Sequence, residues 1–178
     1  MHISRTVPWA VAIAVVVAVA CAVWFLRSHG FSARSEPTAL EAFLARHARQ
    51  LATEPGARNL RNPLAPTPLN IAEARDHFAD HCAICHANNG SGKTQVNSAL
   101  YPPAPDLRKP ETQSLTDGEI FYIIKNGIRF TGMPGWGGED RENWKLVLFI
   151  RRLPEITAKD IEFMKESTIV RKRNQASR

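Results

Sequence analysis

Two thiols and an imidazole stand together in the middle of the chain, in the segment Cys82-Ala83-Ile84-Cys85-His86. Two thiols one helical turn apart can form thioethers with the two vinyl groups of a haem, and the adjoining imidazole can bind the iron. The spacing therefore predicts one covalently attached haem c at Cys82 and Cys85, with His86 as an iron ligand. Apolar residues at helical spacing predict that the preceding segment is a helix whose apolar face continues to the cysteines; they are Ile71, Ala74 and Phe78.

A pair of cysteines at this spacing has two other interpretations, a redox dithiol and half of a zinc site. A zinc site needs two further ligands at matching spacing, and the third cysteine, Cys21, lies in an apolar run. A thioredoxin-like dithiol belongs to a βαβ pattern, which the sequence does not show. The histidine directly after Cys85 favours haem attachment.

A glycine-rich segment downstream, Thr131-Gly132-Met133-Pro134-Gly135-Trp136-Gly137-Gly138, offers a second iron ligand. Its glycines and proline predict irregular backbone that approaches a flat ligand closely. The thioether of Met133 is a soft ligand, and methionine opposite histidine raises the reduction potential of haem iron. A methionine that fills the core is the alternative, and Met164 is the rival ligand.

Other polar groups have roles around such a haem. Three prolines in the segment Tyr101–Leu107 exclude a regular helix and suit the wall of a haem pocket, where the Pro102 carbonyl is a candidate acceptor for the second nitrogen of His86. Arg108, Lys109 and Arg129 are candidates to pair with haem propionates or to guide docking, with simple surface charge as the alternative. Two further histidines, His77 and His81, are interpreted as surface or packing residues.

The segment from Val7 to Leu26 contains no charged residue and is long enough, as a helix, to span about 30 Å. A retained signal anchor is the preferred interpretation, because the run exceeds the usual apolar core of a signal peptide. A signal cleaved near Ala18-Val19-Ala20, or lipidation at Cys21, are the alternatives. All three export the rest of the chain to the side where c-type haem is attached.

Local signals predict helices in the remainder. A capping box at Thr38 and Glu41 predicts an amphipathic helix over 39–52, before a proline-rich linker, and a second at Thr116 and Glu119 begins a helix that Gly127 ends. The predicted haem-domain helices begin with Asn70 as an N-cap and end with one that has Ile161 and Met164 inward. The predicted organisation is a transmembrane segment (1–27), a linker (28–69), a haem domain (70–166) and a basic flexible tail (167–178).

The net charge of +6 does not come from the haem segment. From residue 70 to 165, twelve Lys and Arg stand against thirteen Asp and Glu, and no basic face is interleaved with aromatic residues. Nucleic-acid binding is therefore not expected. No catalytic triad, phosphate loop or paired carboxylates are visible, so neither an enzyme nor a small-molecule substrate is predicted.

With the attachment motif upstream and Gly132-Met133-Pro134 downstream, the segment from about Asn70 to Lys165 resembles class I c-type cytochromes of the bacterial monohaem kind. The resemblance implies an all-α class I cytochrome c fold, with His86 and Met133 as axial ligands and electron transfer without chemistry on a substrate. The expected protein is a single-pass cytochrome c of the bacterial cytoplasmic membrane, facing the periplasm, that carries single electrons between respiratory proteins. The alternatives are a fixed subunit of a larger oxidase or reductase, or a haem sensor or enzyme with a displaceable ligand.

Overall fold

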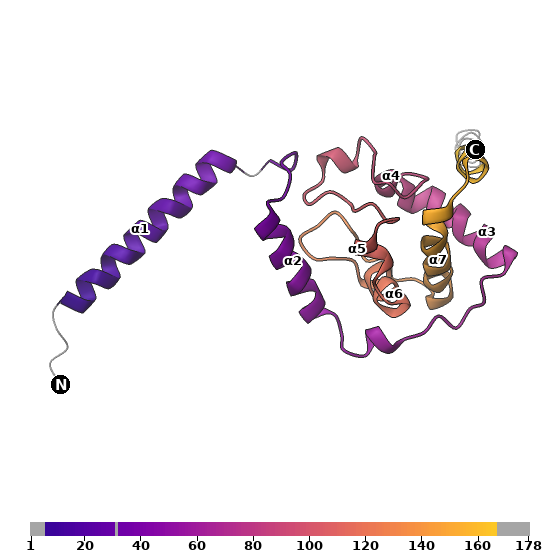
Figure 1. The fold of residues 1–178 in the computed structure, drawn as a ribbon, viewed down its shortest axis with the longest axis horizontal. Helices are drawn as coiled ribbons and strands as arrows, with labels where there is room; N and C mark the ends of the chain where they lie inside the picture. Colours follow the sequence, from indigo (N-terminus) through magenta and orange to yellow (C-terminus); the bar gives the residue numbers. More distant parts are fainter. Residues whose placement is uncertain (1–5, 31, 167–178) are drawn as a thin grey trace. The chain divides into compact units, whose positions relative to one another are not determined.

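The computed structural model describes residues 6–30 and 32–166, which divide between two compact units, Met1–Ser35 and Glu36–Arg178. The first unit is the helix α1 (Thr6–His29), shown in indigo in Figure 1. Within it, Pro8–Ser28 is long and apolar enough to cross a membrane, and none of its most apolar stretch is buried. The predicted basic tail and the charges at His2 and Arg5 lie outside the described residues.

The second unit is all-helical in its described part, with no strand, as predicted (Figure 1). Its α-helices are α2 (Ala39–Ala52), α3 (Pro68–His77), α4 (Ala83–His86), α5 (Pro110–Gln113), α6 (Asp117–Asn126) and α7 (Asp140–Arg152). Single turns η1 (Ala57–Asn59), η3 (Asn97–Ala99) and η4 (Leu153–Glu155) connect them, and η2 (Phe78–Cys82) is a π-helical turn. Residues 158–166 form a last helix.

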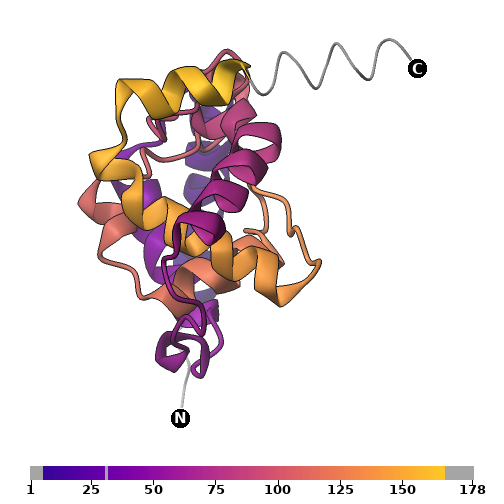
Figure 2. The same ribbon diagram turned by 90° about the vertical axis from the view of Figure 1, so that its right-hand side faces the viewer.

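The core lies where α3 and its continuation cross α7, which Figure 2 shows in magenta and orange. Phe78, Val147, Leu153 and Met164 are completely buried there. Met164 comes from the last helix and points inward as predicted, so it is a core residue. Burying side chains of this size stabilises the fold by about 1.5–3 kcal/mol each.

Local capping explains where several helices begin. Both predicted capping boxes are present, and α2 has the predicted bounds, while Gly127 ends α6. The prediction that Asn70 is the N-cap of the first haem-domain helix is wrong: Thr67 caps α3, and its hydroxyl accepts a hydrogen bond from the Asn70 N–H. Asn70 is buried instead, and its side chain donates to the carbonyl of Ala65, which is why a residue with capping chemistry lies inside the helix.

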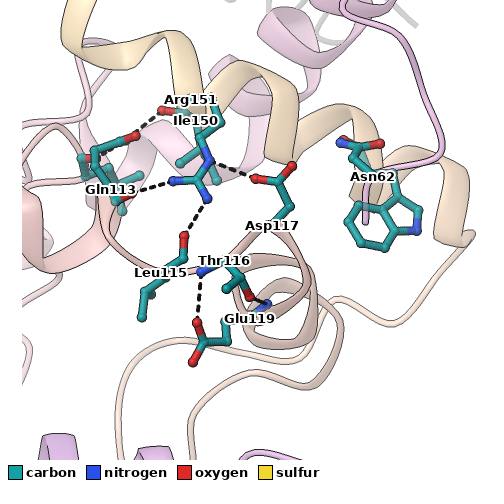
Figure 3. Close-up of polar contacts among 10 residues, drawn as sticks. Asn62, Gln113, Leu115, Thr116, Asp117, Glu119, Ile150 and Arg151 are labelled. Atoms are coloured by element: carbon teal, nitrogen blue, oxygen red, sulfur yellow. Dashed lines mark hydrogen bonds and ion pairs between the residues drawn. The ribbon is translucent and has the colours of Figure 1, made fainter. Parts of the chain in front are cut away.

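One arginine joins α7 to the segment before α6 (Figure 3). The Arg151 guanidinium donates to the carbonyls of Gln113 and Leu115 and to the Asp117 carboxylate at 2.5–2.8 Å. In return, the Gln113 amide donates to the carbonyl of Ile150 at 3.0 Å. These hydrogen bonds pair the carbonyls of Gln113 and Leu115, before α6, with a side chain of α7, and they position α6 against α7.

Candidate functional site

The two cysteines and His86 lie on one continuous helical path that begins in α3. The π-turn η2 inserts an extra residue between Phe78 and Cys82, and α4 carries Cys85 and His86. Immediately after His86, Ala87 takes a φ of +59° and a ψ of 158°, backbone angles that glycine ordinarily occupies. The helix therefore stops at the histidine, and the chain turns away at a strained residue beside the candidate ligand.

An apolar cavity of about 370 Å³ opens beside this path. Cys82, Cys85 and His86 line one part of its wall, and Met133 lines another. The structure therefore brings together all four residues predicted to hold a haem. Most of the other lining residues are aliphatic or proline; among them are Leu100, Pro102, Pro103, Pro105, Leu107, Ile120, Ile124, Ile128, Leu146 and Ile150.

The loop that carries Met133 is closed on itself and fixed to the end of α6. The Ile128 N–H donates to the Met133 carbonyl at 3.1 Å, and the Met133 N–H donates to the Thr131 hydroxyl at 3.1 Å. The N–H groups of Trp136 and Gly137 donate to the last carbonyls of α6, which lack partners within the helix. The methionine is half-buried, so its position is set by backbone hydrogen bonds and not by packing in the core.

The proline-rich segment forms another wall of the cavity, and one buried side chain holds it in place. The Asn97 amide donates to the carbonyls of Gly92 and Ala104 at 2.6 and 3.1 Å, and its oxygen accepts from the Ala104 N–H at 2.5 Å. Asn97 is 6% exposed. It thus joins the loop after the cysteine motif to the proline-rich wall, a role that the sequence analysis missed because asparagine is common in turns.

Burial controls the protonation of the site. It raises the pKa of Cys82 to about 12, with a smaller contribution from Cys85, whose own pKa is also raised by burial. Since a redox dithiol depends on an accessible thiolate, this environment does not favour that alternative. No group of three or more possible metal-binding His, Cys, Asp or Glu side chains occurs in the described part of the chain.

Burial lowers the pKa of His86, so its imidazole is neutral and able to bind a metal. The backbone of Pro105, and not the predicted Pro102 carbonyl, interacts with the imidazole and raises its pKa by a smaller amount. The Nδ1 atom is buried, and it makes no hydrogen bond of good geometry. The apolar cavity, the two free thiols and this buried imidazole fit a haem c.

The cations proposed from sequence lie elsewhere. Arg108 pairs with Asp106 at 2.7 Å, Lys109 and Arg129 are exposed, and none of the three lines the cavity. His81 does line it, with its ring edge-on to Trp136 at 5.4 Å. The lining also includes a cation that the sequence analysis did not single out, Arg49 of α2.

Residues 69–150 match the family model described as cytochrome c oxidase, cbb3-type, subunit III. This part of the chain is a cytochrome c domain. Such a domain implies covalently bound haem c, electron transfer by that haem, and redox protein partners. Proteins with this domain are typically electron carriers and lie outside the cytoplasm. The N-terminal helix has the length and composition of a membrane anchor or of a signal peptide.

One solved structure similar to the chain is the Kuenenia stuttgartiensis reducing HAO-like protein complex Kustc0457/Kustc0458. The two chains are 21% identical with a TM-score of 0.45, and the match covers 51% of this chain and 46% of that one. This chain thus matches about half the length of that relative. No curated protein matches the chain.

Proposed function

We propose that this protein is a monohaem c-type cytochrome, anchored in a bacterial cytoplasmic membrane by α1, that carries single electrons between respiratory proteins on the periplasmic side. The observation that supports it best is the cavity wall, where Met133 joins Cys82, Cys85 and His86 although it lies far from them in the sequence. Haem c at this site supplies a one-electron redox centre.

Each of the four residues has a separate role in this proposal. Cys82 and Cys85 would hold the haem covalently, and His86 and Met133 would bind its iron. With both iron ligands supplied by the chain, haem c would exchange single electrons, and no catalytic residue would be required. The cavity wall is mainly apolar, which would disfavour water as a competitor for the iron.

The anchor rests on α1. Its apolar side chains are exposed within its own unit, which in water is unfavourable and in a bilayer is favourable. Trp9 and Trp24 lie near its two ends, where interfacial indoles are favoured. Cleavage near Ala20 or lipidation at Cys21 are the alternatives, and mass spectrometry of the mature protein distinguishes all three.

A second candidate function is a fixed electron-transfer subunit of a membrane oxidase or reductase. The description of the matching family, a subunit of an oxidase, favours it. The two candidates differ in assembly: a fixed subunit co-purifies with its enzyme from mildly solubilised membranes in constant proportion, whereas a mobile carrier is recovered by itself.

Optical spectra of the full-length protein, made with the export and haem-ligation machinery, test the site. The wild type should keep its pigment in acidified organic solvent and show a sulfur-to-iron absorption band when oxidised. Met133→Leu should lose the band, while Met164→Leu, a matched change in the core, should keep it. Pigment released by solvent would contradict covalent attachment, and a band that survives in Met133→Leu would contradict its ligation. Carbon monoxide bound by the reduced wild type would indicate a sensor or enzyme with a displaceable ligand.

A further inference from the structure

The cavity wall is nearly devoid of permanent charge. Among the described residues that line it there is no aspartate, glutamate or lysine, and the one arginine is Arg49. That arginine belongs to α2 (Ala39–Ala52), which lies outside the matched cytochrome c domain at residues 69–150. An element added to the domain therefore supplies the single fixed positive charge on an apolar wall.

The helix α2 does not pack on the domain through its large apolar side chains. Ala42 and Arg49 are half-buried, whereas its large apolar side chains are exposed; these are Leu40, Phe43, Leu44 and Leu51, with Leu51 at 88%. An amphipathic helix that packs only for hydrophobic burial would show the opposite arrangement. Its inward face therefore carries Arg49 and a small alanine, and not its large apolar side chains.

Several contacts attach this segment to the domain. The pKa of the Tyr101 hydroxyl is raised, first by desolvation and next by a hydrogen bond with Glu41 of α2. Beyond α2, the Asn62 amide donates to the carbonyl of Trp144 at 2.9 Å. The backbone of Gly118 in α6 fits so closely under the Ala57 carbonyl that a Cβ there would overlap it. Helix α2 is thus held against the helices of its own unit (Figure 1), and its Arg49 lines the cavity.

Among the residues that the structure describes, Arg49 has no close acidic partner of its own. No ion pair within 4.0 Å involves it in the part of the chain that the structure describes. The carboxylate of Glu119 is near enough to raise its pKa, but that group is paired with Arg58 at 2.9 Å and accepts from the Thr116 N–H at 2.8 Å. Burial, the larger effect, lowers the pKa of Arg49.

We propose that Arg49 binds a propionate carboxylate of the haem, so that α2 acts as a cover that completes the cofactor site from outside the cytochrome c domain. This inference rests on the proposed function. Haem carries two propionates, and a carboxylate beside an apolar wall is costly unless a charged donor pairs with it. The cations that the sequence suggested as propionate partners do not line the cavity, whereas Arg49 does; they are Arg108, Lys109 and Arg129.

Removing this charge has a defined electrostatic consequence. A cation near the haem stabilises the reduced form, because the oxidised iron carries one more positive charge. Arg49→Gln should therefore shift the ratio of oxidised to reduced protein several-fold toward oxidised at a fixed applied potential. It should also raise the pKa of the propionate and move the pH-dependent region of the midpoint potential to higher pH.

The test is a spectroelectrochemical titration of full-length holoprotein from about pH 5 to 9. Arg49→Lys retains the charge and should stay close to the wild type. Arg46→Gln is the matched control, because it removes an exposed charge from the same helix three residues away. The other ionisable groups around this wall are unchanged in every variant: Glu41, Arg58, His81, Cys82, Cys85, His86, Tyr101 and Glu119.

The outcomes separate the two proposals. If Arg49→Gln and Arg46→Gln leave potential and pH profile equally unchanged in haem-loaded protein, the assignment of Arg49 is wrong and the proposed function stands. A lower melting temperature of Arg49→Gln without a displaced pH profile would mean that the residue only attaches α2, and would equally overturn the assignment. A wild type without covalent haem would overturn both proposals.

Discussion

Gly127, the residue that ends α6, packs against the backbone of the methionine loop, and replacing it with alanine should be strongly destabilising. Its φ is +70°. A Cβ at this position would lie 2.4 Å from the Gly135 nitrogen, 2.5 Å from the Pro134 carbonyl carbon and 2.7 Å from the Met133 carbonyl oxygen. All three are backbone atoms, so no side-chain rotation can relieve the overlap, and the loop itself must move.

The loss of folding free energy in Gly127→Ala has two causes, backbone strain and steric overlap. Two other glycines allow these causes to be measured separately. A side chain at this backbone conformation costs about 1–3 kcal/mol, and forcing atoms into a packed region adds about 1–3 kcal/mol. Gly127→Ala should therefore lose about 2–6 kcal/mol, a large part of the 5–15 kcal/mol that typically stabilises a folded protein. Gly137 has a φ of +55° but open space around its Cβ position, so Gly137→Ala should lose only about 1–2 kcal/mol. Gly56 has neither constraint, and Gly56→Ala should be neutral or slightly stabilising.

Urea denaturation of the three holoprotein variants measures these differences. We expect Gly56→Ala to have the highest urea midpoint, Gly137→Ala an intermediate one and Gly127→Ala the lowest. The sulfur-to-iron band should be weakened only in Gly127→Ala. Equal midpoints for Gly127→Ala and Gly137→Ala would refute the reasoning, because they would mean that the methionine loop yields to an added methyl group without cost.

Three further perturbations follow from buried polar contacts. Asn97→Ala removes three hydrogen bonds and leaves the Ala104 carbonyl and N–H without these partners, while the Gly92 carbonyl keeps the Thr94 N–H. Thermal unfolding should show a loss of about 1–3 kcal/mol; exposed Ser98→Ala, which removes one surface hydrogen bond, is the control. Arg151→Ala should be similarly costly and Arg151→Lys only partly corrective, because one ammonium cannot reach two carbonyls and a carboxylate together; full recovery with lysine would contradict this geometry. The Arg108 guanidinium lowers the pKa of Asp106 to about 2, so this pair stabilises the fold above about pH 4, and the contribution is lost as the pH falls toward 2. Urea midpoints of the wild type and Asp106→Asn should thus differ at pH 7 and converge at low pH, and a constant difference would show that charge is not the cause.

Several features of this protein could be predicted from the sequence because they depend on neighbours along the chain. Thr38 and Thr116 begin α2 and α6 through hydrogen bonds to residues three positions on, and Gly127 ends α6. The attachment motif also depends only on local spacing, and it led to the cytochrome c domain that the family comparison shows. The assignment of ligands to iron stays a prediction.

The tertiary structure decided what depends on distant parts of the chain. Thr67 displaced Asn70 as the N-cap because burial of the Asn70 side chain offered it a partner at Ala65. Asn97 acquired its role from three backbone groups that come together only when the loop after the motif meets the proline-rich wall. Neither arrangement is encoded by a local pattern, since both contacts form only when the chain is packed.

The orientation of α2 shows the same division most clearly. The sequence by itself determined that residues 39–52 form an amphipathic helix, because periodicity and capping are properties of the segment alone. Only the packed structure decided that Arg49 faces the cavity while Leu40 and Leu51 face outward. The physical reason is that a helix side is chosen by the surface it meets, and that surface is assembled from residues far away in the chain.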